Sequence, residues 1–174
     1  QWPPNPTHFW TDAIQDSTGA QQLGFQPSHR ENQLPKVPTV REAISDLPLV
    51  ASGDGADELD YVVDDEGSLT SYQEQMRVCP EGQTPRIYNH EASRHTTKMI
   101  SMIRASKPGE SVDPKYTDSR KWHPDKPSFT VKALGSGGGS TNRRAFHYDE
   151  RTPRGSTIRE NARIQSFPDW YRFM

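Results

Sequence analysis

Hydrophobic residues are scarce in this sequence. They make up 30% of its 174 residues, and the mean hydropathy is −0.97, whereas a soluble domain commonly contains about 45 to 50% apolar residues. The length allows one domain, because domains commonly hold about 100 to 200 residues. We therefore expect a single unit with a thin core that rests partly on other protein or on a ligand.

Long hydrophobic runs and cysteine pairs are missing as well. No apolar run approaches the ~18 residues needed to cross a bilayer, and residues 1–10 lack both the basic and the apolar region of a secretory signal. These absences predict a protein that is neither exported nor partnered with a membrane. The single cysteine, Cys79, cannot form an internal disulfide, which suits a reducing compartment.

Acidic and basic residues are unevenly distributed along the chain, although the formal net charge is only −2. Residues 1–85 contain 4 basic and 14 acidic residues, while residues 86–174 contain 17 basic and 9 acidic residues. A basic region favours a polyanionic partner, because bound phosphates release their counterions. Attraction between the two halves explains the same asymmetry, so charge alone leaves both possibilities open.

The pattern of prolines and caps divides the chain in two. Residues 1–38 are rich in proline and lack periodic apolar positions, which predicts an irregular connecting segment before a folded region of residues 39–174. The folded region opens with a capping box at residues 39–42 and a short helix that ends at Pro48. A second capping box, at residues 157–160, predicts another short helix near the end of the chain.

The middle of the folded region is harder to assign. Residues 54–66 carry seven acidic residues, which predicts a solvated loop. Residues 68–78 leave strand and helix both open. Asn89 is expected to cap a helix of about 15 residues, and residues 126–132 alternate polar and apolar side chains as a strand does.

Two histidines on the helix expected after Asn89, His90 and His95, resemble a zinc-protease motif. Their spacing of five places the imidazoles about 140° apart on a helix, whereas zinc-binding pairs at a spacing of four share one face. We therefore expect no metal site, and we expect these histidines at the surface or in helix caps.

Residues 135–140 form a glycine-rich loop after the expected strand. A dinucleotide-binding loop would need a glycine where Ser140 stands, and a phosphate-binding loop would need a lysine after its last glycine. A flexible loop remains, and composition alone also allows an engineered linker. At the end of the chain, four aromatic residues form a cluster that we expect to dock on something, because large rings are costly to leave in water. They are Phe167, Trp170, Tyr171 and Phe173.

Residues 154–169, RGSTIRENARIQSFPD, resemble the ninth conserved motif of the cytosine-C5 DNA methyltransferases. Residues 122–131 and the glycine-rich loop are similar to the P-S-x-T-[IV] and Gly-Gly signature of that family's target-recognition domain. Three further segments match in the family's order: residues 6–8, 39–48 and 88–92. The resemblance covers nearly the whole chain and implies an α+β fold, namely a small, irregular, loop-rich target-recognition domain with short strands and a few short helices.

The same resemblance shows which parts of a methyltransferase this sequence does not contain. The family's nucleophile follows a proline in a Pro-Cys motif, whereas Cys79 precedes one. The Glu-Asn-Val motif and the glycine-rich turn that binds the methyl donor are also missing. We therefore expect no catalytic residue in this chain, which alone would be inactive. S-adenosylmethionine is implied only as the cofactor of the complete enzyme.

The family's division of labour implies that this chain binds double-stranded DNA and positions it for a catalytic domain of the same methyltransferase, which flips out the cytosine. Glycines permit close approach of the backbone to DNA, and arginine can make two hydrogen bonds to guanine. The expected DNA-binding residues are Thr130, Lys132, Gly137, Gly138, Gly139, Arg143 and Arg144. For each cation the alternative is a phosphate contact or simple solvation.

Two expectations stay open on the sequence alone. The chain is either the DNA-binding part of an enzyme or a catalytically dead relic or regulatory module that binds a protein through the terminal aromatic cluster. The opening residues 6–8 and the acidic insert favour a eukaryotic enzyme and hence the nucleus, with the cytoplasm as the location if the source is bacterial.

Overall fold

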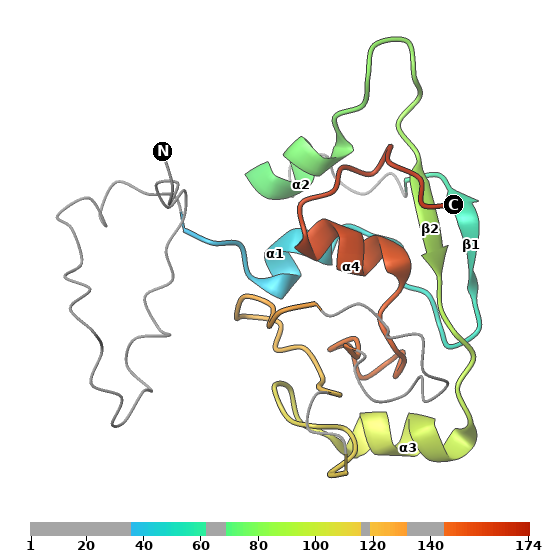
Figure 1. The fold of residues 1–174 in the computed structure, drawn as a ribbon, viewed down its shortest axis with the longest axis vertical. Helices are drawn as coiled ribbons and strands as arrows, with labels where there is room; N and C mark the ends of the chain where they lie inside the picture. The colour runs from blue at the N-terminus through green and yellow to red at the C-terminus, as the bar shows by residue number, and fades with distance from the viewer. Residues whose placement is uncertain (1–35, 62–68, 116–118, 132–144) are drawn as a thin grey trace, which may run out of the picture. The chain divides into compact units, whose positions relative to one another are not determined.

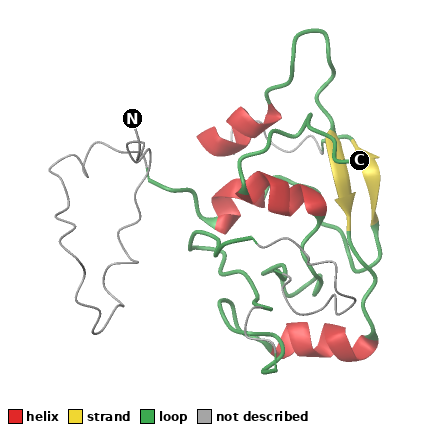
Figure 2. Ribbon diagram, viewed as in Figure 1, coloured by secondary structure: helices red, strands yellow, loops and turns green. Residues whose placement is uncertain are grey.

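The structure, a computed structural model, describes residues 36–61, 69–115, 119–131 and 145–174. The chain divides into two units, residues 1–37 and residues 38–174, and every helix and strand described here belongs to the second. Loops connect short elements throughout this unit (Figure 2). The described elements are helices and one pair of strands, which confirms the predicted mixed α and β composition. In chain order they are α1 (Val40–Ile44), β1 (Gly55–Leu59), α2 (Ser71–Arg77), β2 (Ile87–Glu91), α3 (Thr97–Ala105) and α4 (Ile158–Ile164).

Capping boxes start three of the four described helices. At α1 the Thr39 side chain accepts from the Glu42 N–H, and the Glu42 carboxylate accepts from the Thr39 N–H at 2.7 Å. The same reciprocal pair starts α4, so both capping boxes predicted from the sequence are confirmed. A third box at Thr70 starts α2. The segment for which sequence periodicity left strand and helix open is therefore a helix.

β1 and β2 form an antiparallel ribbon in which Gly55 pairs with Glu91 and Leu59 with Ile87. Gly55 has a φ of +99°, and a Cβ atom there would lie 2.2 Å from the His90 carbonyl oxygen, so only glycine fits. The prediction of a solvated acidic loop is therefore wrong for residues 55–59. The strand tolerates its acids because cations oppose them: Arg86 Nη1 lies 2.7 Å from the Glu58 carboxylate.

The helix expected from Asn89 begins later than predicted, because Asn89 lies within β2. Its φ is +60°, and its side-chain amide donates to Asp57 Oδ1 and to the Phe173 carbonyl. The helix cap is instead Thr96, whose hydroxyl accepts from the Met99 N–H. The Asn89 side chain therefore bonds to residues distant in the sequence and does not cap a helix, although its residue type suggested a cap.

Residues 126–131 are a loop, so the strand predicted over residues 126–132 is wrong for its described part. Pro127 has no N–H to donate, and the Ser128 hydroxyl accepts from the Trp122 indole N–H at 2.9 Å. Phe129 packs against the core rather than into a sheet. The alternation of polar and apolar residues here reflects packing of single side chains onto a core.

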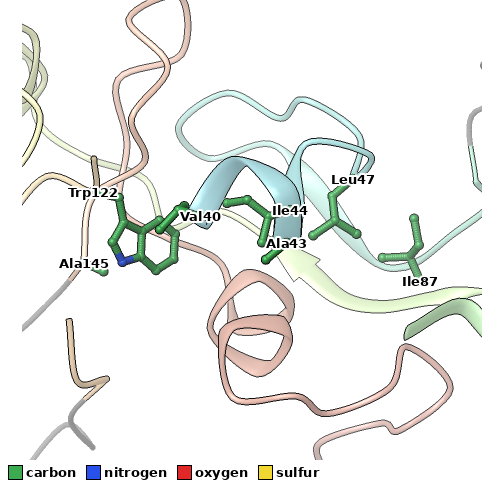
Figure 3. Packing of buried hydrophobic residues seen from close by; sticks show 7 residues of the cluster. All are labelled: Val40, Ala43, Ile44, Leu47, Ile87, Trp122 and Ala145. Carbon is green, nitrogen blue, oxygen red and sulfur yellow. The ribbon is translucent and has the colours of Figure 1, made fainter. Parts of the chain in front are cut away.

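The core of the described residues consists of two small apolar clusters. The larger brings α1 residues against Ile87, Trp122 and Ala145 (Figure 3). The smaller joins Ile103 of α3 to Val112 and Phe146. Between α1 and β2 lies α4, which contacts both (Figure 1). This central position makes α4 the element around which the other parts of the unit are arranged.

Candidate nucleic-acid interface

α4 and the residues beside it bury an unusual amount of charge. Five charged side chains of residues 154–169 are at most 1% exposed. Isolated charges of this kind are too costly to bury, so each must be paired or fully hydrogen-bonded. We call these residues the α4 polar cluster. They are Arg154, Arg159, Glu160, Arg163 and Asp169.

Arg163 lies at the centre of this cluster and uses all of its donors. Its guanidinium donates twice to Asp169, at 2.6 Å each, twice to Asp46, at 2.9 and 3.0 Å, and once to the Ala43 carbonyl at 2.9 Å. Arginine has five N–H groups, and five bonds are made. Arg163 therefore ties α4 to α1 and to the chain that follows α4.

Arg154 and Glu160 form the second buried pair. Two nearly parallel hydrogen bonds of 2.9 and 2.6 Å join the guanidinium to the carboxylate, and Arg154 also donates to the Val50 carbonyl at 2.7 Å. Burial raises the pKa of the Glu160 carboxyl, but the hydrogen bonds and charge of Arg154 outweigh this and lower that pKa to about 2. Glu160 is therefore ionised, and the same carboxylate caps the N-terminus of α4.

Two buried histidines complete the cluster in their neutral form. His90 Nε2 lies 2.8 Å from the Pro48 carbonyl, which can only accept, so His90 Nδ1 accepts from the Thr157 hydroxyl at 2.9 Å. His147 Nδ1 accepts from the Asp149 N–H at 3.1 Å. Burial lowers the pKa of both imidazoles, that of His147 to about 4.

The histidine positions correct the sequence-based expectations. His90 is buried in β2, so the prediction of a surface or capping residue is wrong for it. The angle inferred for a helix does not apply to His90 and His95, because the first lies in a strand and the second in the loop before α3. His95 Nε2 accepts from the Gly155 N–H at 2.9 Å. Among the described residues no group of histidine, cysteine and acidic side chains could hold a metal ion.

Arg159 connects α4 to the end of the chain. Its guanidinium donates to the carbonyls of Tyr88, at 2.7 Å, of Pro168, at 3.0 Å, and of Tyr171. The Asn89 side chain adds a bond from the Phe173 N–H at 2.8 Å. The terminal segment is therefore fixed in place, and its rings contact one another, with Phe167 and Phe173 centred 5.4 Å apart.

The segments that carry the family resemblance meet in this cluster. Asp46 comes from residues 39–48, His90 from residues 88–92, and the arginines from residues 154–169. Sequence reasoning identified the capping box that contains Glu160 but missed Asp46 and Asp169 as partners of Arg163. The only signal in the sequence was an aspartate within a matching segment, which does not by itself name its partner.

Of the predicted DNA-binding residues, the structure describes only Thr130, which is exposed. The others lie outside the described residues. They are Lys132, Gly137, Gly138, Gly139, Arg143 and Arg144.

The residues on either side of that segment are firmly placed. Before it, Phe129 packs against the larger apolar cluster, to which the buried Ala145, after it, also belongs. Phe146 donates its N–H to the Arg120 carbonyl, and its own carbonyl accepts from the Trp122 N–H, both at 2.9 Å. The described residues that flank residues 132–144 in the sequence thus belong to the core.

Among the described residues, Thr152 Oγ1 is the one buried side-chain polar atom without a hydrogen-bond partner. No described helix is long and apolar enough to cross a membrane.

Comparison with known proteins places this architecture among the DNA-modifying methyltransferases. The fold is similar to a solved E. coli prophage protein described as a DNA modification methyltransferase, with a TM-score of 0.58 and 21% identity over 79% of this chain and 39% of that chain. The sequence is 34% identical over 151 residues to Type II methyltransferase M.DdeI of Desulfomicrobium norvegicum, covering 78% of this chain and 34% of that protein. No protein-family model matches the chain.

A further relative shows which base these DNA methyltransferases modify. DNA (cytosine-5-)-methyltransferase M.ApeKI of Aeropyrum pernix is 40% identical over 89 residues, which are 51% of this chain and 16% of that protein. The predicted resemblance is therefore confirmed: the chain is homologous to a part of the cytosine-C5 DNA methyltransferases. It spans about a third or less of the length of the curated relatives it matches. These relatives are bacterial and archaeal, which agrees with the bacterial alternative and gives no support to a nuclear location.

Proposed function

We propose that this chain is the target-recognition part of a DNA (cytosine-5) methyltransferase. It positions duplex DNA for methyl transfer to C5 of cytosine by a catalytic domain outside this chain, where S-adenosylmethionine supplies the methyl group. Residues 39–174 form the recognition region, and residues 1–38 connect it to the rest of the enzyme. In a bacterial or archaeal source this enzyme works in the cytoplasm.

The observation that carries this proposal is the packing of the residues on either side of residues 132–144. Phe129 and Ala145 are held in the larger apolar cluster, and Phe146 is held by backbone hydrogen bonds to Arg120 and Trp122. The sequence of residues 132–144 is polar, glycine-rich and basic, and a recognition loop requires ordered residues at its two ends, because a rigid scaffold positions a variable contact surface.

The predicted DNA-binding residues suit different contacts with DNA because of their chemistry. Glycines 137 to 139 let the backbone approach the bases without a Cβ in the way. Arg143 and Arg144 can each donate two hydrogen bonds to O6 and N7 of a guanine. Thr130 and Lys132 suit phosphate oxygens, which set the position of the protein on the duplex without reading its sequence.

In this proposal the α4 polar cluster supports recognition without touching DNA. Its side chains are buried and their donors are taken by protein acceptors, as the five bonds of Arg163 illustrate. They hold α1, β2 and the terminal segment in one arrangement. Loss of this cluster would therefore reduce DNA binding only through loss of folding.

A second candidate function rests on the terminal aromatic cluster. Trp170 is 39% exposed and Tyr171 is 42% exposed, although both are held by an ordered backbone. Exposed rings on a fixed support suit a protein partner. In an enzyme this partner would be the catalytic domain, and in a regulatory relic it would be another protein.

Salt dependence of DNA binding tests the proposed function. We expect the 174-residue chain to bind a duplex, with an affinity that falls steeply as salt rises, because phosphate contacts release counterions. Arg143→Ala with Arg144→Ala should weaken binding by roughly tenfold or more and reduce the salt slope by about 1 to 2. Fluorescence anisotropy over a series of salt concentrations measures both quantities.

A matched control removes two cations elsewhere. Arg86→Ala with Arg172→Ala changes the net charge equally, at the β ribbon, where Glu58 and Asp57 already pair with these arginines. This double variant should bind DNA nearly as wild type does. Absence of DNA binding by the wild-type chain at low salt, together with retained binding of a protein partner, would favour the regulatory alternative.

A further inference from the structure

The segment around α3 is basic and carries no acid. Residues 92–109 contain four lysines and arginines and not one aspartate or glutamate. All four cations are exposed. We call them the α3 basic face: Arg94, Lys98, Arg104 and Lys107.

These cations differ from the arginines elsewhere in the unit, which mostly have carboxylate partners. Even exposed arginines follow this rule, since Arg41 pairs with Asp125 at 2.9 Å and Arg151 with Asp149 at 2.5 Å. By contrast, no residue of the α3 basic face forms an ion pair with any residue that the structure describes. Four uncompensated cations on one segment produce a local positive potential that attracts a polyanion.

The geometry of α3 places two of these cations on the side of the helix that faces away from the core. Ile103 is fully buried and defines the inner face of the helix. At 100° per residue, Lys98 and Arg104 each lie about 60° from Ser101, the centre of the opposite face, and about 9 Å apart along the axis. Only small side chains separate them there, so an extended anion can reach both. These are Thr97, Ser101 and Ala105.

α3 also packs against a residue that follows residues 132–144 in the sequence. Ile103 packs against Phe146, which is two residues beyond Arg144. The buried Lys121 donates its Nζ to the carbonyls of Ser106, at 3.2 Å, and Ile103, at 3.4 Å, and so holds the C-terminal end of α3. The smaller apolar cluster thus joins α3 to Phe146, a described residue that follows the expected recognition loop in the sequence.

We propose that the α3 basic face binds phosphates of the duplex beside the bases that the loop contacts. This inference rests on the proposed function and adds a second contact surface to it. Lys98 and Arg104 bind phosphate oxygens from the exposed side of α3, while Arg94 and Lys107 extend the face at its two ends. Such contacts strengthen binding equally for every DNA sequence, because phosphates carry no sequence information.

Substitution of two cations on α3 tests the inference. Lys98→Gln with Arg104→Gln in the 174-residue chain should reduce the salt slope of duplex binding by about 2 and the affinity in low salt by roughly tenfold or more. The loss should be the same for duplexes of unrelated sequence. Lys98→Arg with Arg104→Lys keeps the charge and should keep the slope, and thermal melting confirms that each variant is folded.

The matched control is Arg86→Gln with Arg172→Gln, which removes the same charge from paired positions. Equal slopes for the α3 double variant and this control would overturn the inference. An unchanged affinity for DNA with a loss of binding to poly-glutamate would overturn it as well, because the face would then serve an acidic protein.

The outcomes also separate the inference from the proposed function. If wild type binds duplex DNA with a steep salt slope, Arg143→Ala with Arg144→Ala weakens binding, and the α3 double variant does not, then only the α3 inference fails. If wild type shows no salt-dependent binding of DNA, the proposed function fails and the inference falls with it.

Discussion

Arginines in two regions of this unit have opposite surroundings. Around α4 they are fully buried and every one faces carboxylates or carbonyls, with Arg163 making five hydrogen bonds. Around α3, Arg94 and Arg104 are exposed and have no ion-pair partner among the described residues. The residue type is the same, so the difference lies in which acceptors the fold brings near. One group stabilises the unit, and the other remains available to an external anion.

The strongest test of this comparison is the removal of a buried arginine. Arg163→Met removes four hydrogen bonds from the buried Asp46 and Asp169, and Arg77 and the Tyr61 hydroxyl compensate only part of this loss. We expect the free energy of unfolding to fall by about 3 to 5 kcal/mol. Urea denaturation followed by circular dichroism measures this change. Arg86→Met, at an exposed pair, should cost less than about 1 kcal/mol. Similar losses for both variants would contradict the distinction between the two regions.

Acid should destabilise the α4 region next most strongly. His147 has a folded-state pKa of about 4 against an ordinary value of 6.5, so the unfolded chain binds more protons between these pH values. Stability is therefore lost as pH falls from 6.5 towards 4, by roughly 3 kcal/mol for this residue. Glu160, with a pKa of about 2 against 4.5, extends the loss from pH 4.5 downward.

Denaturation curves measured at several pH values test this dependence. His147→Gln should flatten the change between pH 6.5 and pH 4 relative to wild type, because the residue no longer takes up a proton on unfolding. The buried His90, whose pKa is also lowered by burial, accounts for the part that remains. A pH dependence in the variant as steep as that of wild type would show that other groups control acid unfolding.

A smaller effect is expected from one hydroxyl at the edge of the cluster. Tyr72 donates to the Arg163 carbonyl and lies 3.1 Å from the Ser166 hydroxyl. Tyr72→Phe keeps the ring and removes these bonds, so stability should fall by about 1 kcal/mol. Differential scanning calorimetry measures the change. A loss several times larger would mean that Tyr72 also organises the ion pairs of Arg163.

The smallest effect on stability is expected on α3. Arg104→Gln should change the free energy of unfolding by less than about 0.5 kcal/mol, because the side chain is exposed and forms no ion pair with a described residue. The same substitution should lower the salt slope of DNA binding. A clear loss of stability without a change in slope would assign Arg104 a structural role and remove the contrast with Arg163.

Local signals predicted well where one segment contains all the interacting groups. Both capping boxes were confirmed because a Thr and a Glu three residues apart satisfy each other's backbone N–H groups. The prediction was wrong at Asn89, where distant partners decide the structure, and at residues 126–131, where single side chains bond to or pack on the core. Asn89 bonds to Asp57 and Phe173, and Trp122 takes Ser128 as its acceptor. All the predicted DNA-binding residues, including the exposed Thr130, stay predictions.

What the sequence by itself determined about this protein is its family and the starts of α1 and α4, because the motif of residues 154–169 and the two capping boxes are contiguous patterns. Only the tertiary structure showed why the separated matching segments belong together. Asp46, His90 and Arg163 lie far apart in the chain and meet in one buried cluster. The physical reason is that a buried charge is tolerated only beside a partner, and the fold can supply that partner from any position in the sequence.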